Sequence, residues 1–189
     1  MKQIGRDLFL RGMVNSHSGN MSVKLDNDIY ITRTRSMLGR LKRDDIVKVT
    51  LLDELPKKTL RKASSETPVH IRIYKETDAK AVIHAHPPYA VLLSFFKVQH
   101  QIAPIDSEGK LFLKEIPIVH EEDDKEKRAQ KISEVLKDCQ IVIVRGHGSF
   151  AIGESLEEAY MYTTTLESSC FFIYHLEILK KEVGHEILY

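Results

Sequence analysis

The sequence is poor in cysteine, in net charge and in long apolar runs, and each shortage excludes a class of protein. Its two cysteines, Cys139 and Cys170, form no disulfide framework, so we expect an intracellular, reducing compartment. The formal net charge of +1 argues against binding of nucleic acid through a basic field. The longest apolar stretch, at residues 90–96, is interrupted by Ser94 and is far shorter than the ~20 residues of a membrane span.

Charged residues are spread along the chain, including its first segment, which lacks the apolar stretch of a signal peptide. Of 189 residues, 42 % are hydrophobic and 29 % are charged, as in soluble globular proteins. We therefore expect one cytoplasmic domain spanning residues 1–189, with neither a nucleic acid nor a membrane as its partner. These totals predict no activity, so a function has to come from local clusters of residues.

Apolar spacing predicts a mixture of helices and strands, which is typical of a sheet with helices packed on it. Helices are predicted at residues 4–14, 64–76, 89–96, 127–136 and 155–181. Strands are predicted at residues 21–25, 28–32, 45–52, 81–83, 116–119, 141–144 and 149–152. We expect residues 56–60 to form a loop, and the charged run 121–128 to be a solvated loop that leads into the next helix.

Two histidines, His84 and His86, follow the buried strand at residues 81–83. Side chains two positions apart on a strand point to the same face, so the two imidazoles converge. His147 lies between two glycines, just after the buried strand at residues 141–144. If these strands are neighbours, three neutral imidazoles with an open fourth position form a catalytic type of zinc site. The alternative is a set of unconnected core or surface histidines.

Glu66 is the candidate base beside such a metal, because a Lewis acid that polarises a carbonyl needs a proton acceptor close to it. It lies near the start of the helix predicted at residues 64–76. The alternative is a first-turn glutamate whose charge only favours the helix dipole.

Three polar segments are candidate phosphate sites. Residues 64–65 offer hydroxyls and the free N–H groups of a helix start, and the turn at residues 18–20 offers backbone N–H groups and an amide. Residues 32–36 interleave hydroxyls with Arg33 and Arg35, and arginine binds phosphate in a bidentate manner. Ordinary turn chemistry and a solvated strand end are the alternatives.

Five segments in this order resemble the class II aldolase/adducin family: Ser18-Gly19-Asn20-Met21-Ser22, Ile31-Thr32-Arg33-Thr34, Ser64-Ser65-Glu66, His84-Ala85-His86 and Gly146-His147-Gly148. The resemblance extends from about residue 1 to residue 180. It implies an α/β fold, a three-layer α/β/α sandwich around a mixed, mostly antiparallel sheet. It also implies a homotetramer with active sites at the subunit interfaces.

The resemblance further implies a role for each matching residue. His84, His86 and His147 would hold one zinc ion per subunit, and imidazole ligands also suit other divalent metals. Glu66 would be the displaceable fourth ligand and the base that moves a proton beside the carbonyl of dihydroxyacetone phosphate. The residues implied for the substrate phosphate are Gly19, Asn20, Thr34, Ser64 and Ser65.

Two departures from the family pattern bear on the reaction. Arg35 stands where the aldolases carry a glycine, so it either binds the phosphate itself or selects another acidic group. Residues 102–108 lack the tyrosine that serves the aldolases as a proton donor, and Asp106 and Tyr189 are the candidate substitutes.

The resemblance predicts a zinc-dependent aldolase that cleaves or forms a short-chain ketose phosphate. Two sibling reactions stay open as alternatives: 4-epimerisation of a pentulose 5-phosphate and dehydration of a ketose 1-phosphate. A non-catalytic interaction module, as in adducin, is a third reading, and the intact histidines and Glu66 argue against it.

Overall fold

The computed structural model describes residues 1–52, 56–96 and 100–183, and eight strands in these ranges form one sheet in the order β3-β2-β1-β4-β8-β7-β6-β5. The strands are β1 (Asn20–Leu25), β2 (Asp28–Thr32), β3 (Ile46–Thr50), β4 (Ala81–Ala85), β5 (Gln101–Ile102), β6 (Ile116–Val119), β7 (Ile141–Val144) and β8 (Gly148–Gly153). Only the β6–β7 pair is parallel among the described pairs. The predicted mixed, mostly antiparallel sheet is confirmed.

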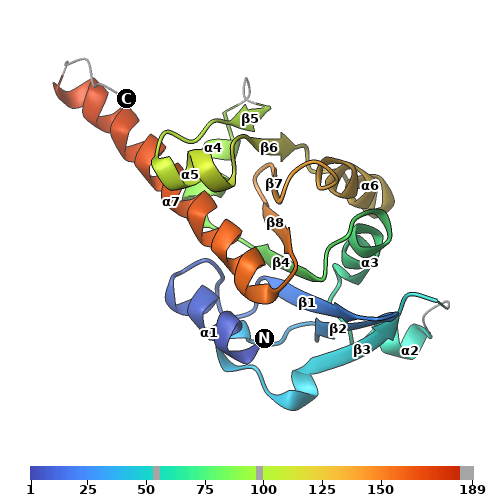
Figure 1. The fold of residues 1–189 in the computed structure, drawn as a ribbon. Helices are drawn as coiled ribbons and strands as arrows, with labels where there is room; N and C mark the ends of the chain where they lie inside the picture. The colour runs from blue at the N-terminus through green and yellow to red at the C-terminus, as the bar shows by residue number, and fades with distance from the viewer. Residues whose placement is uncertain (53–55, 97–99, 184–189) are drawn as a thin grey trace.

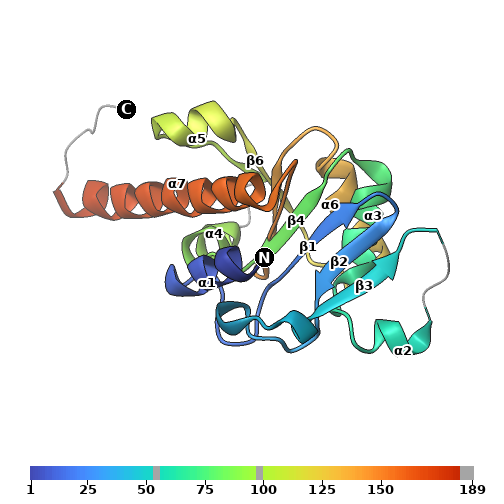
Figure 2. The ribbon, with the colours of Figure 1, turned by 60° about the horizontal axis from the view of Figure 1, so that its bottom comes forward.

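Helices cover both faces of this sheet. They are α1 (Lys2–Leu10), α2 (Lys57–Leu60), α3 (Thr67–Glu76), α4 (Pro88–Ser94), α5 (Ser107–Phe112), α6 (Lys125–Val135) and α7 (Leu156–Val183), with two 3₁₀ turns, η1 (Leu38–Arg40) and η2 (Arg43–Asp45). Helices α3 and α6 lie on one face, and α1, α4, α5 and α7 lie on the other (Figure 1 and Figure 2). The α/β/α layering follows from this arrangement. No helix in the described ranges is both long and apolar enough to cross a membrane.

The central strand β4 separates two hydrophobic cores, because its side chains alternate between the faces. Ala81, Ile83 and Ala85 belong to the core beneath α1, α4 and α7. Val82 belongs to the core beneath α3 and α6. His84 shares the parity of Val82, so its imidazole projects on the α3–α6 side, at the carboxyl end of the strand.

Three local expectations are wrong. Residues 57–60 form the one-turn helix α2 rather than a loop. Helix α3 begins at Thr67, with Glu66 as its N-cap, so the serines at 64 and 65 precede the helix instead of opening it. The charged run 121–128 is not uniformly solvated, because α6 begins at Lys125 and the side chain of Arg128 is buried.

Candidate active site

Strand pairing brings the predicted site residues to one end of the sheet. Asn20 at the start of β1 is paired with His84 on β4, and His84 is paired with Phe150 on β8. His147 lies in the turn between β7 and β8, beside the end of β4. A Cβ atom on Gly148 would lie 2.3 Å from the backbone oxygen of Ala85, so only glycine permits this close approach.

The three imidazoles converge as the sequence predicts. Their ring centroids are 4.8 Å (His84–His86), 4.9 Å (His84–His147) and 5.3 Å (His86–His147) apart. One nitrogen from each ring lies within 4.8 Å of the others, and the Nε2 atoms of His84 and His86 are 3.0 Å apart. Two nitrogens bound at 2.0–2.1 Å to a tetrahedral zinc lie about 3.3 Å apart. The donor set therefore fits a small divalent cation.

Hydrogen bonds fix the lone pairs of two of these rings. Nδ1 of His84 donates to the carbonyl oxygen of Ser149 at 3.0 Å, and Nδ1 of His147 faces a carboxylate oxygen of Glu121 at 3.1 Å. Each bond leaves the Nε2 lone pair for a ligand, which is the usual arrangement of metal-binding histidines. Burial, with His86 and His147 nearby, lowers the pKa of His84 well below its usual value. Burial likewise lowers the pKa of His86 to about 4, so both rings are neutral and able to coordinate.

Glu66 is held by an arginine that sequence reasoning missed. Nη2 of Arg128 donates to both carboxylate oxygens of Glu66, at 3.0 and 3.1 Å, and Nη1 of Arg128 binds Glu121. Glu121 in turn contacts His147, so one chain of charges links the predicted base to a predicted ligand. Among the described residues, the potential metal ligands that lie close enough together to share one ion are the three histidines, and Glu66 is not among them.

Backbone pairing assembles the polar half of the site. The Ser64 N–H donates to the carbonyl of Thr32, and the Thr34 N–H donates to that of Lys62. These bonds place the serines beside the end of β2. Gly19 has φ +75° in the turn before β1, a left-handed conformation that glycine adopts readily.

One cavity of about 340 Å³ is lined by all ten residues predicted to hold the metal, to act as the base or to bind the phosphate. These residues are Gly19, Asn20, Thr34, Arg35, Ser64, Ser65, Glu66, His84, His86 and His147. His17, Ser18 and Arg33 also line it. Histidines in one cavity with hydroxyls, amides and guanidinium groups can hold a cation at one end and an anion at the other.

Of the two candidate proton donors, only Asp106 belongs to the described residues. Asp106 is the N-cap of α5, where its carboxylate accepts a hydrogen bond from the Gly109 N–H at 2.8 Å, and it does not line the cavity. Tyr189 lies outside the described residues.

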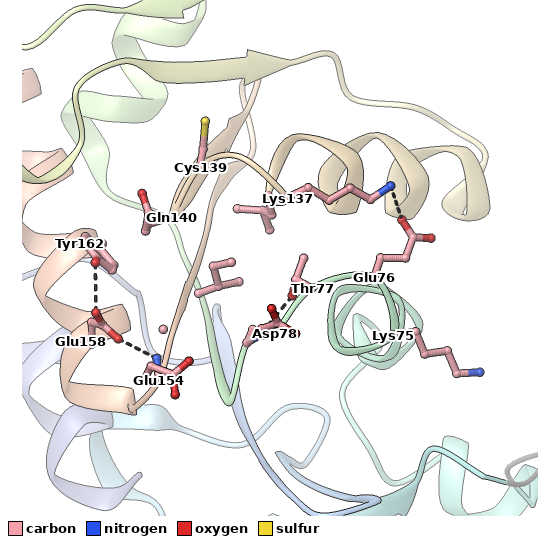
Figure 3. A pocket seen from close by; sticks show the side chains of 14 residues that line it. Lys75, Glu76, Thr77, Asp78, Lys137, Cys139, Gln140, Glu154, Glu158 and Tyr162 are labelled. Carbon is pink, nitrogen blue, oxygen red and sulfur yellow. Dashed lines mark hydrogen bonds and ion pairs between the residues drawn. The ribbon is translucent and has the colours of Figure 1, made fainter.

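A second cavity lies between the ends of α3 and α6 and the start of α7 (Figure 3). Several of its polar groups contact one another: Lys137 pairs with Glu76, and the Glu158 carboxylate accepts hydrogen bonds from the Tyr162 hydroxyl and the Glu154 N–H. Burial raises the pKa of its cysteine, Cys139, which keeps the thiol protonated and weakly nucleophilic. This cavity lacks the reactive groups of the first.

Known proteins with similar sequences carry names that fit a site of this composition. Residues 1–174 match the model of the "Class II Aldolase and Adducin N-terminal domain" family, so the chain belongs to that family. An L-fuculose phosphate aldolase of Methanocaldococcus jannaschii is 36 % identical over 168 residues, which cover 87 % of this chain and 88 % of that protein. A methylthioribulose-1-phosphate dehydratase of Methylococcus capsulatus is 31 % identical, with 87 % and 86 % coverage.

The crystal structure of L-fuculose-1-phosphate aldolase from Thermus thermophilus superposes with a TM-score of 0.90. It is 34 % identical, and the match covers 99 % of this chain and 96 % of that one. The names of these relatives are those of lyases, and the chain is an enzyme of this type.

Proposed function

We propose that this protein is a zinc-dependent aldolase that cleaves or forms a short-chain ketose phosphate of the L-fuculose 1-phosphate type. The observation that carries the proposal is the single cavity that holds three imidazoles, a carboxylate and several phosphate-type donors. The aldolase names of two similar proteins support the choice of reaction. The products of cleavage would be dihydroxyacetone phosphate and an aldehyde.

His84, His86 and His147 would hold the metal, and zinc is the ion that three neutral imidazoles with an open position suit best. Other divalent metals also accept such ligands. The bound cation supplies a Lewis acid that polarises the substrate carbonyl. The ring orientations described above need no rearrangement for this, since the bonds to Ser149 and Glu121 already direct the lone pairs.

Glu66 would move the proton. During cleavage the hydroxyl on the fourth carbon gives up its proton to a base, the bond between the third and fourth carbons breaks with its electron pair going to the third carbon, and the fourth carbon becomes the aldehyde. Glu66 then delivers a proton to the third carbon, beside the carbonyl, so that one proton is released and one is taken up. In the reverse direction the ionised carboxylate removes that proton. Its bonds to Arg128 hold both carboxylate oxygens in place, and Glu66 lines the cavity. As a fourth metal ligand, Glu66 would share its carboxylate between the ion and Arg128.

The phosphate would lie at the other end of the cavity, where it fixes the substrate and orients the reacting carbon. The proposed phosphate ligands are Gly19, Asn20, Thr34, Arg35, Ser64 and Ser65. Arg35 is exposed and forms no ion pair with the described part of the chain, so its guanidinium is available to a ligand in the cavity.

The test is a retro-aldol assay on a panel of ketose 1-phosphates, in which release of dihydroxyacetone phosphate is followed with and without chelator. Glu66→Gln keeps the shape of the side chain but not its basicity, and we expect the rate to fall about 10²–10⁴-fold. Glu122→Gln, on an exposed ion pair outside the cavity, is the control. No chelator-sensitive release from any ketose phosphate would refute the proposal.

The second candidate is a sibling reaction at the same site, either dehydration of a ketose 1-phosphate or 4-epimerisation of a pentulose 5-phosphate. Its support is the similarity to the dehydratase and the absence of a cavity-lining tyrosine or aspartate among the described residues. Mass spectrometry of the products separates the reactions: two fragments for cleavage, an unchanged mass for epimerisation and loss of water for dehydration.

The assembly is also part of the proposal. We infer a homotetramer of single-domain chains spanning residues 1–189, as in the family that the sequence resembles. Phe9 on α1 and Phe171 and Phe172 on α7 are large, exposed apolar side chains that an interface would cover. Both cysteines are free, which suits a cytoplasmic, reducing compartment. Light scattering on the purified protein would give the mass of the assembly.

A further inference from the structure

A buried chain of polar side chains runs from the phosphate end of the cavity into the core beneath α3. Nε2 of His70 lies 2.6 Å from Oδ1 of Asn20, and Nδ1 of His70 lies 2.7 Å from Oγ of Ser22. Ser22 Oγ lies 2.8 Å from the hydroxyl of Tyr74. His70 and Ser22 are fully buried, and Asn20 is the only one of these four residues that lines the cavity. Burying such groups is costly unless each has a partner.

The protonation state of each group allows the hydrogen bonds of this chain to run in one direction only. Burial lowers the pKa of His70 to about 3, so the ring is neutral and carries a single N–H. Oδ1 of Asn20 can only accept a hydrogen bond, so Nε2 of His70, which faces it at 2.6 Å, is the donor and Nδ1 is the acceptor. The Tyr74 O–H then donates to Ser22, and Ser22 donates to Nδ1 of His70.

The proton of His70 is therefore on Nε2, which donates to Oδ1 of Asn20. This bond leaves Nδ2 of Asn20 with both of its hydrogens. Nδ2 has no hydrogen bond within the described part of the chain, and it is not sealed from the cavity. A rotated amide would instead present its carbonyl oxygen, which repels the oxygen atoms of a phosphate.

We propose that His70, oriented by Ser22, is a positioning residue that locks the Asn20 amide with its NH₂ group toward the cavity, so that the subsite accepts an oxyanion. The inference rests on the proposed function, in which this end of the cavity holds the substrate phosphate. It adds a specificity element that lies outside the cavity wall. The neutral hydroxyl of an unphosphorylated sugar is a weaker acceptor than an oxyanion, so it gains less from the locked amide.

The first test uses the unmodified protein. Nitrogen-15 NMR of the histidine rings reports which nitrogen carries the proton, and it needs neither substrate nor turnover. We expect His70 as the neutral Nε2–H tautomer between pH 5 and pH 8. The Nδ1–H tautomer, or a charged ring in this range, would overturn the inference.

The second test measures binding of inorganic phosphate by calorimetry. His70→Leu frees the amide, and loss of one well-aligned hydrogen bond to an anion weakens binding about 10- to 100-fold. His70→Gln keeps a donor near the position of Nε2, and we expect it to restore affinity to within a few-fold of the wild type. Thr163→Val is the control, because it removes a buried hydroxyl on the other face of the sheet.

The proposal is overturned if phosphate does not bind the wild type, if His70→Leu binds it as tightly, or if His70→Gln is as weak as His70→Leu. Phosphate binding is measured without turnover. A protein that binds phosphate as predicted but cleaves no sugar phosphate would therefore refute the proposed function and leave this inference standing.

Discussion

The buried ion pair between Arg128 and Glu66 gives a quantitative test of the site. Arg128→Met removes the charge and keeps most of the length of the side chain. The two partners are only 10 % and 12 % exposed, so water cannot replace the lost guanidinium. Glu121, the other partner of Arg128, is 40 % exposed and can be solvated.

The loss of stability follows from this difference in burial. Removing one partner of a buried ion pair costs roughly 3–5 kcal/mol, because the other charge stays buried and unpaired. We expect the lower end, about 3 kcal/mol, because the side chain of Glu66 lines a cavity and is not completely enclosed by protein. In a protein of this size each kcal/mol corresponds to about 2–4 °C, so Tm should fall by roughly 6–12 °C.

Thermal unfolding followed by circular dichroism, with chelator present so that metal binding adds nothing, measures this effect. Lys131→Met on the same helix is the control. Lys131 forms an ion pair with Glu122 that is open to solvent, so the change in Tm should be small. Arg128→Lys should fall between the two, since one ammonium group cannot contact both carboxylates as the guanidinium does.

The catalytic rate of Arg128→Met is a second measurement on the same variant. Glu66 loses the group that aims it, and a misplacement of about 1 Å costs on the order of 100-fold in rate. We expect kcat of Arg128→Met to fall by that order at a temperature where the variant is folded. An unchanged Tm, or wild-type kcat in a folded Arg128→Met protein, would refute the role assigned to this ion pair.

Three further predictions concern other parts of the site. Burial lowers the pKa of His70 to about 3, against about 6.5 in the unfolded chain, so the folded state is favoured above about pH 6.5 and this contribution is lost as pH falls. The free energy of unfolding in urea should therefore drop by about 2 kcal/mol between pH 8 and pH 5 through His70 alone, and His70→Gln should abolish this contribution. Gly19→Ala should lower the free energy of unfolding by more than about 1 kcal/mol and weaken phosphate binding, because its Cβ would lie 2.9 Å from the His84 oxygen at φ +75°; unchanged urea unfolding would contradict this. Arg35 has φ +59°, so Arg35→Gly should raise the free energy of unfolding by up to about 1 kcal/mol while it weakens phosphate binding in calorimetry, and a variant that binds phosphate normally would exclude Arg35 as a ligand.

Local pattern was sufficient for most of the sheet. The strands at residues 28–32, 116–119 and 141–144 are β2, β6 and β7 with the predicted bounds, because apolar alternation or a continuous apolar run marks each of them. Strand β5 and helix α5 were not predicted. They have two and six residues, too few to establish a period.

The candidate site was predictable to the extent that its residues lie in short motifs. All ten predicted residues line one cavity, which depends on the β1–β4–β8 pairing that the motifs only suggested. Arg128 and Glu121 were not found, because a charged run that packs against a carboxylate looks the same in sequence as one that faces water. Their partners are 62 and 26 residues away in the chain, so only the fold shows the contact.

The most direct test of the whole account is to titrate metal-free protein with zinc and follow release of dihydroxyacetone phosphate from a ketose 1-phosphate. We predict no release without metal and full activity at one zinc ion per chain, with neither metal binding nor activity in a folded His84→Ala variant. Activity that is independent of metal, or that survives in His84→Ala, would contradict the central claim.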